Sequence, residues 1–179
     1  RVVSNYDIAM LDFAGAYLDL YLAVGGNNLS SLQIPPLLET LRCGNNNLSQ
    51  LPTLPSSLSD LDCSDNNISV LPSLPTGLDY LDCGHNPITQ IPQLPPPLGT
   101  LKCNSTLISS IPTLSVLMQN LECHDNPNLY CLPKLTRLYS FKFYNTGITC
   151  LPNHIEVVYQ SIPLVDTVPL CLGPDANIN

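Results

Sequence analysis

The chain has 179 residues, the length of one ordinary domain, and 11% of them are charged against 44% that are hydrophobic, which excludes a disordered polyelectrolyte. Fourteen acidic residues outnumber six basic ones, and the net charge of −8 argues against nucleic acid or an anionic membrane surface as a partner. No apolar run approaches the roughly 18 residues that a membrane-spanning helix needs. No basic segment followed by an apolar one comes after Arg1, so we expect no targeting segment within this chain.

The first part of the chain, residues 1–21, is out of phase with the repeats that follow. We expect it to form an N-terminal cap, because the end of a stack of repeats needs cover. Apolar residues alternate between Leu18 and Val24, which predicts a strand leading into the first repeat. Ser4 followed by Asp7 fits a helix start before the apolar residues at 8–11.

A twenty-residue repeat occupies residues 22–157. The string L-x-C-x-x-N-x-[LI] begins at three positions, and variants begin at four more, in the order Leu22, Leu41, Leu61, Leu81, Leu101, Leu121 and Phe141. Residues two apart on a strand face the same side, so the leucine and the cysteine of each copy should both point inward. One copy cannot bury that side alone, whereas stacked copies can, as a parallel sheet with strands about 4.8 Å apart. The sequence therefore predicts a solenoid of about seven repeats.

The second half of each repeat has the form L-P-x-L-P, as in residues 51–55 and 71–75. Proline fixes φ near about −65° and disfavours helix at the preceding residue, which predicts an extended, polyproline-like convex side and a shallow curvature. The asparagine after each strand, such as Asn66, should turn the corner and bind backbone groups of that bend and of the next repeat. Thr106 and Thr146 offer a hydroxyl group in its place.

These features resemble the leucine-rich repeat, whose L-x-x-L-x-L-x-x-N-x-L core is matched here with cysteine in the third apolar place. The leading leucine of that core is present in most copies, at Leu38, Leu58, Leu78, Leu98 and Leu138, and Met118 replaces it once. The short form is similar to the repeats of secreted effectors from enteric pathogens and to cysteine-containing repeats in secreted or surface proteins of Bacteroidetes-type bacteria. The resemblance implies a parallel sheet on one face, little helix, and a secreted or cell-surface location.

The last part of the chain, residues 158–179, loses the period and contains three prolines. We expect it to form an irregular C-terminal cap with a loose tail. Bulky residues replace small ones just before it, as at Phe141 and Phe143.

The eight cysteines fall into two classes. Five share one inward position on successive repeats, where parallel side chains do not converge for a disulfide, and we expect them to be small buried hydrophobic residues. For the other three we favour a Cys150–Cys171 disulfide, with Cys131–Cys150 as the next pairing. The remaining alternative is that all three are reduced thiols. A disulfide there would imply an oxidising compartment.

The sequence carries no recognisable catalytic motif. There is no phosphate-binding glycine loop and no nucleophile motif, and buried cysteines make poor thiolate nucleophiles. His85 and His124 follow their strands closely, so we interpret them as solvent-facing turn residues. We therefore expect no enzymatic activity.

The outward side of the sheet carries two rows of side chains, at positions 40, 60, 80, 100, 120, 140 and at positions 42, 62, 82, 102, 122, 142. Charges and a tyrosine gather in these rows, and aromatic and charged residues are favoured at binding hot spots. The residues predicted to bind a partner are Asp60, Asp62, Tyr80, Asp82, Lys102 and Glu122. The carboxylates at 60, 62 and 82 could also hold Ca²⁺, although Arg42 and Lys102 flank them and can neutralise them.

The favoured hypothesis is a protein-binding module, secreted or at a cell surface, that presents its sheet face to a macromolecule. The alternative is a substrate-recognition fragment of a secreted effector enzyme of the ubiquitin-ligase type, with its catalytic domain absent from this chain. A structural spacer without a partner is a third interpretation. Exposed sheet edges would also allow two copies to pair.

Overall fold

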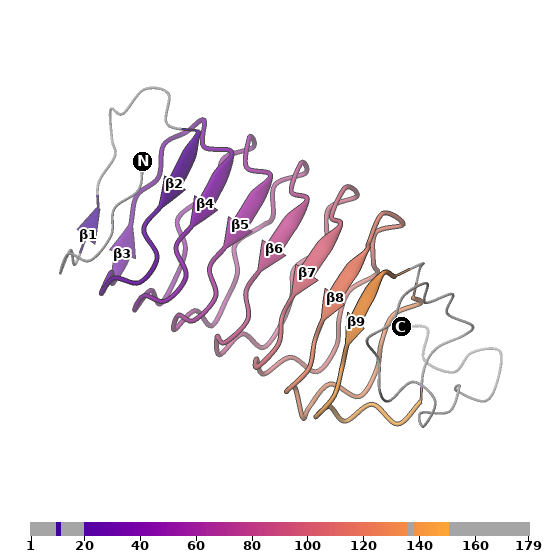
Figure 1. Ribbon diagram of the computed structural model, residues 1–179. Helices are drawn as coiled ribbons and strands as arrows, with labels where there is room; N and C mark the ends of the chain where they lie inside the picture. The colour runs from indigo at the N-terminus through magenta and orange to yellow at the C-terminus, as the bar shows by residue number, and fades with distance from the viewer. Residues whose placement is uncertain (1–9, 12–19, 136–137, 151–179) are drawn as a thin grey trace.

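The computed structural model describes residues 10–11, 20–135 and 138–150, and Figure 1 shows them as a stack of short parallel strands. The strands are β1 (Met10–Leu11), β2 (Tyr21–Ala23), β3 (Ser31–Leu32), β4 (Thr40–Arg42), β5 (Asp60–Asp62), β6 (Tyr80–Asp82), β7 (Thr100–Lys102), β8 (Asn120–Glu122) and β9 (Ser140–Lys142). No helix occurs among the described residues, and so none there is long and apolar enough to cross a membrane.

Seven of these strands form one parallel sheet in the order β2-β4-β5-β6-β7-β8-β9. From β4 onward each residue pairs with the residue twenty positions later, as Leu61 pairs with Leu81. The first step is nineteen residues, from Leu22 to Leu41. The leucine-rich-repeat solenoid predicted from the period is confirmed, together with its register.

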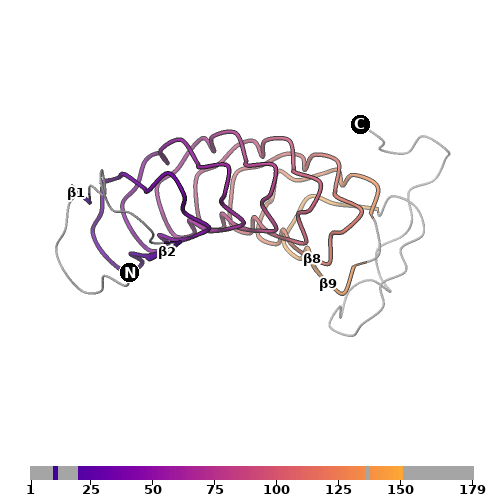
Figure 2. The ribbon, with the colours of Figure 1, turned by 90° about the horizontal axis from the view of Figure 1, so that it is seen from above.

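The side of the solenoid opposite the sheet is extended, as the prolines predict. Residues 51–55, 71–75 and 91–95 contain no regular element, and each is followed by a tight turn. The turn closes with a backbone hydrogen bond from a buried leucine to a proline carbonyl, as from Leu58 N to Pro55 O at 3.1 Å. Figure 2 shows the stack as a gently bent arc with the sheet on its inner side.

The core consists of the same side chains on every rung. Leu61, Leu81 and Leu101 are fully buried, and so are the cysteines two residues after them. Burying one leucine stabilises a fold by about 1.5–3 kcal/mol, so the stability of the stack rests on this repeated row. At the last described rung two aromatic residues take the inward positions, and the rings of Phe141 and Phe143 stack at 4.6 Å.

One corner residue of each rung has a positive φ, a feature that the sequence analysis did not single out. The residues are Gly26, Asn45, Asp65, His85, Ser105, Asp125 and Asn145, with φ between 51° and 71°. This left-handed conformation is tolerated best by glycine and by asparagine, aspartate and histidine. The corner therefore explains why small polar residues and one histidine recur at this position.

The asparagine after each strand ties neighbouring rungs together. The side chain of Asn86 donates to the carbonyls of Cys83 and Gly84 on its own rung and to Cys63 O on the preceding rung, at 2.9–3.2 Å. Its Oδ1 accepts from Ile68 N, also on the preceding rung, at 2.9 Å. The predicted bonding within the bend is confirmed, but the prediction of a bond to the next rung was wrong. The Asn86 side chain points into the solenoid and toward the N-terminal rungs, so it contacts the preceding rung.

The N-terminal segment differs from expectation where it is described. Met10–Leu11 is a strand, β1, that pairs in parallel with β3, so the helix expected to run through residues 8–11 is wrong at this point. The alternating stretch before the first repeat does lead into a strand, β2. The rest of residues 1–19 and the expected C-terminal cap at 158–179 lie outside the described residues.

Candidate functional site

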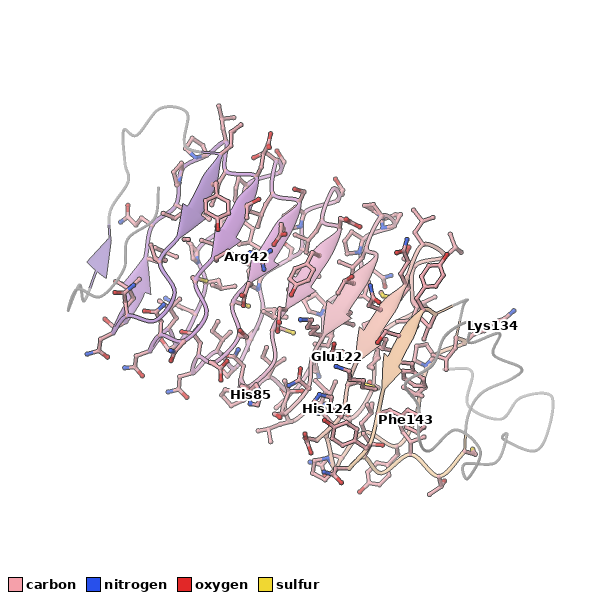
Figure 3. All side chains as sticks on the ribbon, in the orientation of Figure 1. Arg42, His85, Glu122, His124, Lys134 and Phe143 are labelled. Atoms are coloured by element: carbon pink, nitrogen blue, oxygen red, sulfur yellow. The ribbon has the colours of Figure 1, made fainter. Side chains whose placement is uncertain are left out.

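The six residues predicted to bind a partner lie together on the outward face of the sheet. They come from four adjacent strands, β5 to β8, and the two outward rows have the predicted register. Each of these strands has a buried central residue between two half-buried ones, so the outward side chains stand on a rigid surface. Figure 3 shows Arg42 and Glu122 on this surface.

Arg42 on β4 binds both aspartates of the neighbouring strand β5. Its guanidinium lies 2.8 Å from Asp60 Oδ2 and 3.7 Å from Asp62 Oδ2. Asp62 is held further by Ser64, whose hydroxyl and backbone N–H donate to Oδ1 at 2.7 and 3.1 Å. These contacts therefore fix the orientation of the acidic side chains.

Tyr80 on β6 lies between two cations. The guanidinium of Arg42 is 4.9 Å from the centre of its ring, and the ammonium group of Lys102 is 5.6 Å from it. The Lys102 ammonium also lies 3.6 Å from Asp82 Oδ2, and the Tyr80 hydroxyl lies 3.4 Å from the same oxygen. Cation–π contacts of this kind order the long side chains at both flanks of the ring. These four residues and Asp60 form one connected network, which we call the Tyr80 network.

Partial burial changes the ionisation of two carboxylates in this network. Burial raises the pKa of Asp60, Arg42 opposes the rise, and the negative charges of Asp62 and Asp79 add to it. Burial also raises the pKa of Asp82, and so does Asp62, while the Gly84 N–H and Lys102 lower it. Asp60 Oδ1 is buried without a hydrogen-bond partner. The acidic part of the face is thus partly desolvated, and Arg42 and Lys102 supply its compensating charge.

The calcium ion that the three carboxylates could have held is not supported by this arrangement. Asp60 and Asp62 point their Oδ2 atoms at Arg42, and the oxygens of Asp82 bind Lys102 and the Gly84 N–H. Within residues 20–135 and 138–150 no three histidine, cysteine, aspartate or glutamate side chains come together as a metal site. The flanking cations therefore neutralise the carboxylates in the way that the sequence suggested.

The carboxyl end of the sheet face holds a second group of polar residues around His124. Its ring stacks on Tyr144 with 4.4 Å between ring centres, and its Nδ1 lies 2.7 Å from Asp125 Oδ2. Only 13% of this histidine side chain is exposed, so its predicted solvent-facing position is wrong. His85, on an earlier rung, is exposed as predicted. Figure 3 shows both histidines beyond the strands at one edge of the molecule.

The five inward cysteines are free thiols and fully buried. Burial raises the pKa of Cys43 to about 12, and it raises the pKa of Cys63, Cys83, Cys103 and Cys123 as well. The thiols of Cys63 and Cys83 donate to backbone carbonyls of the next rung at 3.4 Å. They behave as the small hydrophobic residues that the sequence predicts and are unsuited to nucleophilic chemistry.

The three remaining cysteines differ from one another. Cys150 is disulfide-bonded, whereas Cys131 is a free and exposed thiol, so the alternative Cys131–Cys150 pairing is not formed. Cys171, the partner in the favoured pairing, lies outside the described residues.

Sequence reasoning placed the outward rows correctly but missed some of the residues that complete the site. Arg42 was expected only to neutralise charge, yet it reaches Tyr80 two strands away. Lys142 lies 3.1 Å from Glu122 Oε1, and the His124–Tyr144 stack adjoins that pair. The shared twenty-residue offset between positions 124 and 144 was a signal that could have indicated the stack.

Comparison with known proteins supports the fold. No protein-family model and no curated protein matches the chain. Among solved structures, YopM from Yersinia enterocolitica WA-314 is 28% identical with a TM-score of 0.63, over 76% of this chain and 35% of that one. A Shigella effector LRR domain is 31% identical with a TM-score of 0.67, over 75% of this chain and 62% of that one.

The chain thus spans less than two thirds of the length of either structure. Both are bacterial effectors or effector domains built from leucine-rich repeats, and the match covers about three quarters of the present chain. The twenty-residue register, the cysteine-containing strands and this similarity together show that the chain is a leucine-rich-repeat solenoid similar to those of these bacterial proteins.

Proposed function

We propose that this chain is a non-enzymatic protein-binding module, secreted or at a cell surface, whose sheet face contacts another macromolecule. The Tyr80 network is the observation that carries the proposal. Asp60, Tyr80, Asp82 and Lys102 are held in one conformation by ion pairs and cation–π contacts. A surface ordered in advance loses little conformational entropy when it binds, which favours affinity.

The similarity to bacterial effector proteins supports a secreted location and a protein partner. The face carries both signs of charge on a rigid sheet, which suits a partner with a matching polar surface. Six residues form the proposed contact, namely Asp60, Asp62, Tyr80, Asp82, Lys102 and Glu122. Pairing of two copies through their sheet edges stays a prediction.

The test compares two double variants with the original chain. Tyr80→Ala with Asp82→Ala removes the centre of the network, whereas Thr89→Ala with Gln90→Ala changes two exposed residues of the same rung away from the sheet. Each biotinylated protein is used to capture partners from cell-surface and matrix extracts, and the affinity of the captured partner is then measured. We expect the first variant to weaken binding at least tenfold and the second to leave it unchanged.

Thermal unfolding provides the control for the folded state. The half-buried side chains of the network contribute little to stability because solvent screens their charges, so the melting temperature should change by only a few degrees. Equal affinities for all three proteins would place the binding surface elsewhere.

A second candidate function follows from the similarity to the Shigella effector LRR domain. The chain would then be the substrate-recognition part of an effector enzyme. The coding sequence around this segment distinguishes the two functions, because only the second requires a catalytic domain in the same polypeptide.

A further inference from the structure

His124 is held rigidly at the end of the binding face by contacts on several sides. Its ring lies nearly parallel to that of Tyr144, at an angle of 15°, and Tyr144 comes from the next rung. Its two nitrogens point at two different carboxylates, those of Asp125 and Glu122. The ring therefore cannot rotate to another arrangement without losing these contacts.

The contact with Asp125 fixes the position of one proton. Nδ1 lies 2.7 Å from Asp125 Oδ2, and an ionised carboxylate only accepts hydrogen bonds, so Nδ1 must carry a hydrogen. The other oxygen, Oδ1, accepts from Asn145 Nδ2 at 2.7 Å. The hydrogen bonds from Asn145 and His124 lower the pKa of Asp125. Asp125 is therefore ionised throughout the pH range in which imidazole side chains change charge.

The contact with Glu122 depends on the second proton. Nε2 lies 3.9 Å from Glu122 Oε2. In a neutral ring with its hydrogen on Nδ1, Nε2 carries a lone pair that faces a carboxylate oxygen, and two acceptors repel each other. In the protonated ring Nε2 becomes a charged donor, and the same contact turns into an ion pair. The geometry thus favours this contact in one protonation state only.

Glu122 has a second cationic neighbour. Its Oε1 lies 3.1 Å from the ammonium group of Lys142 on β9, and Lys102 is the residue opposite Glu122 on the neighbouring strand β7. His85 adds positive potential at Asp125. The charged or titratable groups around the ring are thus Glu122 and Asp125 as anions, Lys142, Lys102 and His85 on the cationic side, and Tyr144.

We propose that His124 is a protonation switch of the binding face, in which the protonated ring forms an ion pair with Glu122 and shares that carboxylate with Lys142. This inference concerns regulation of the proposed binding surface, and so its biological meaning rests on the proposed function. When the ring gains a proton, this end of the face gains one positive charge and Lys142 is held less tightly. Cationic groups of a partner should then bind there less well, and anionic groups better.

The test is a double-mutant cycle measured at two pH values. His124→Asn keeps an amide near the position of Nδ1 and removes Nε2, and Glu122→Gln removes the charge of the second carboxylate. Melting temperatures are measured for the original chain, both single variants and the double variant at pH 8.0 and 5.5. We expect His124→Asn to lower the melting temperature by about 2–4 °C more at pH 5.5 than at pH 8.0, which corresponds to one ion pair in a chain of this size.

The added loss at low pH should be clearly smaller in the Glu122→Gln background, where only the Asp125 carboxylate remains beside the protonated ring. An equal loss at both pH values, or an added loss of the same size with and without the Glu122 carboxylate, would overturn the proposal. His85→Asn is the matched control. His85 is exposed and comes three residues after its strand, whereas His124 comes two residues after its own. Among the described residues its ring bonds only the side-chain amide of Asn104. The pH dependence of this control should be much smaller, since no ion pair joins His85 to a carboxylate among the described residues.

Nitrogen-15 NMR of the imidazole rings tests the geometry independently. We expect the neutral ring of His124 to carry its hydrogen on Nδ1, and a neutral ring with the hydrogen on Nε2 would contradict the proposed contact. Neither measurement uses a partner. A failed switch therefore leaves the proposed binding function standing, and a failed capture experiment leaves the switch standing.

Discussion

The two sides of the same strands differ in what they repeat. On the inner side of β5, β6 and β7 the central residue is leucine each time, and a cysteine follows two positions later. On the outer side the first position of the same strands is Asp60, Tyr80 and Thr100. The inner side chains must fit identical neighbours at a fixed strand spacing, so they are constrained to one type. The outer side chains meet solvent and are free to carry function.

The largest expected effect comes from breaking the inner row. Leu81→Ala removes a fully buried side chain from the middle of the stack, and the rungs on both sides can close the cavity only in part. We expect the free energy of unfolding to fall by about 2–5 kcal/mol, measured by denaturant titration. Thr40→Ala on the outer row is the matched control and should cost less than about 0.5 kcal/mol. Similar losses in the two variants would contradict the division between the sides.

A smaller effect is expected from removing one asparagine of the ladder between rungs. Asn86→Ala leaves the Ile68 N–H without its acceptor and removes a donor from Cys63 O, both in the interior. Buried polar groups that lose a partner cost about 1–3 kcal/mol, so we expect a loss of about 2 kcal/mol in chemical unfolding.

The neighbouring residue of an equivalent bend provides the control. Asn67 is exposed, and within the described residues its side chain makes no hydrogen bond. Asn67→Ala should therefore change the stability by less than about 0.5 kcal/mol. Equal losses of stability for Asn86→Ala and Asn67→Ala would mean that the Asn86 side chain does not link neighbouring rungs.

The inner side could be predicted from the sequence almost completely. The twenty-residue period fixed the register of Leu61 with Leu81, and alternation along each strand fixed which side chains point inward. The extended convex side followed from proline, because its φ is restricted and it disfavours helix at the residue before it.

The outer side could be predicted only as far as the rows themselves. Which side chains touch depends on their length and rotamers, and these are not periodic. Arg42 passes β5 to reach Tyr80, and His124 turns away from solvent because Tyr144 offers it a ring to stack on. The backward reach of the asparagines was missed for a related reason, since the direction of a side chain cannot be read from its spacing along the chain.

The smallest effect concerns an interior corner at which the ladder is weakened, that of Thr106. Thr106 replaces asparagine, and its hydroxyl reaches only Cys103 O on its own rung and the Asn126 side chain. Elsewhere the asparagine accepts from the preceding rung, as Asn86 does from Ile68 N, and among the described residues the Ile88 N–H has no such side-chain acceptor. We expect Thr106→Asn to raise the free energy of unfolding by about 0.5–1 kcal/mol, because two hydrogen bonds are gained and one side-chain contact is lost.

Thr106→Val separates this gain from a simple change of side-chain shape. Valine fills the same volume as threonine but lacks the hydroxyl, so the bonds to Cys103 O and Asn126 are lost and the stability should fall by about 1 kcal/mol. The two variants should therefore shift the melting temperature in opposite directions, each by about 2–4 °C per kcal/mol. A lower melting temperature for Thr106→Asn than for the original chain would mean that this rung is shaped around threonine. The inner side would then tolerate local exceptions that the ladder alone does not explain.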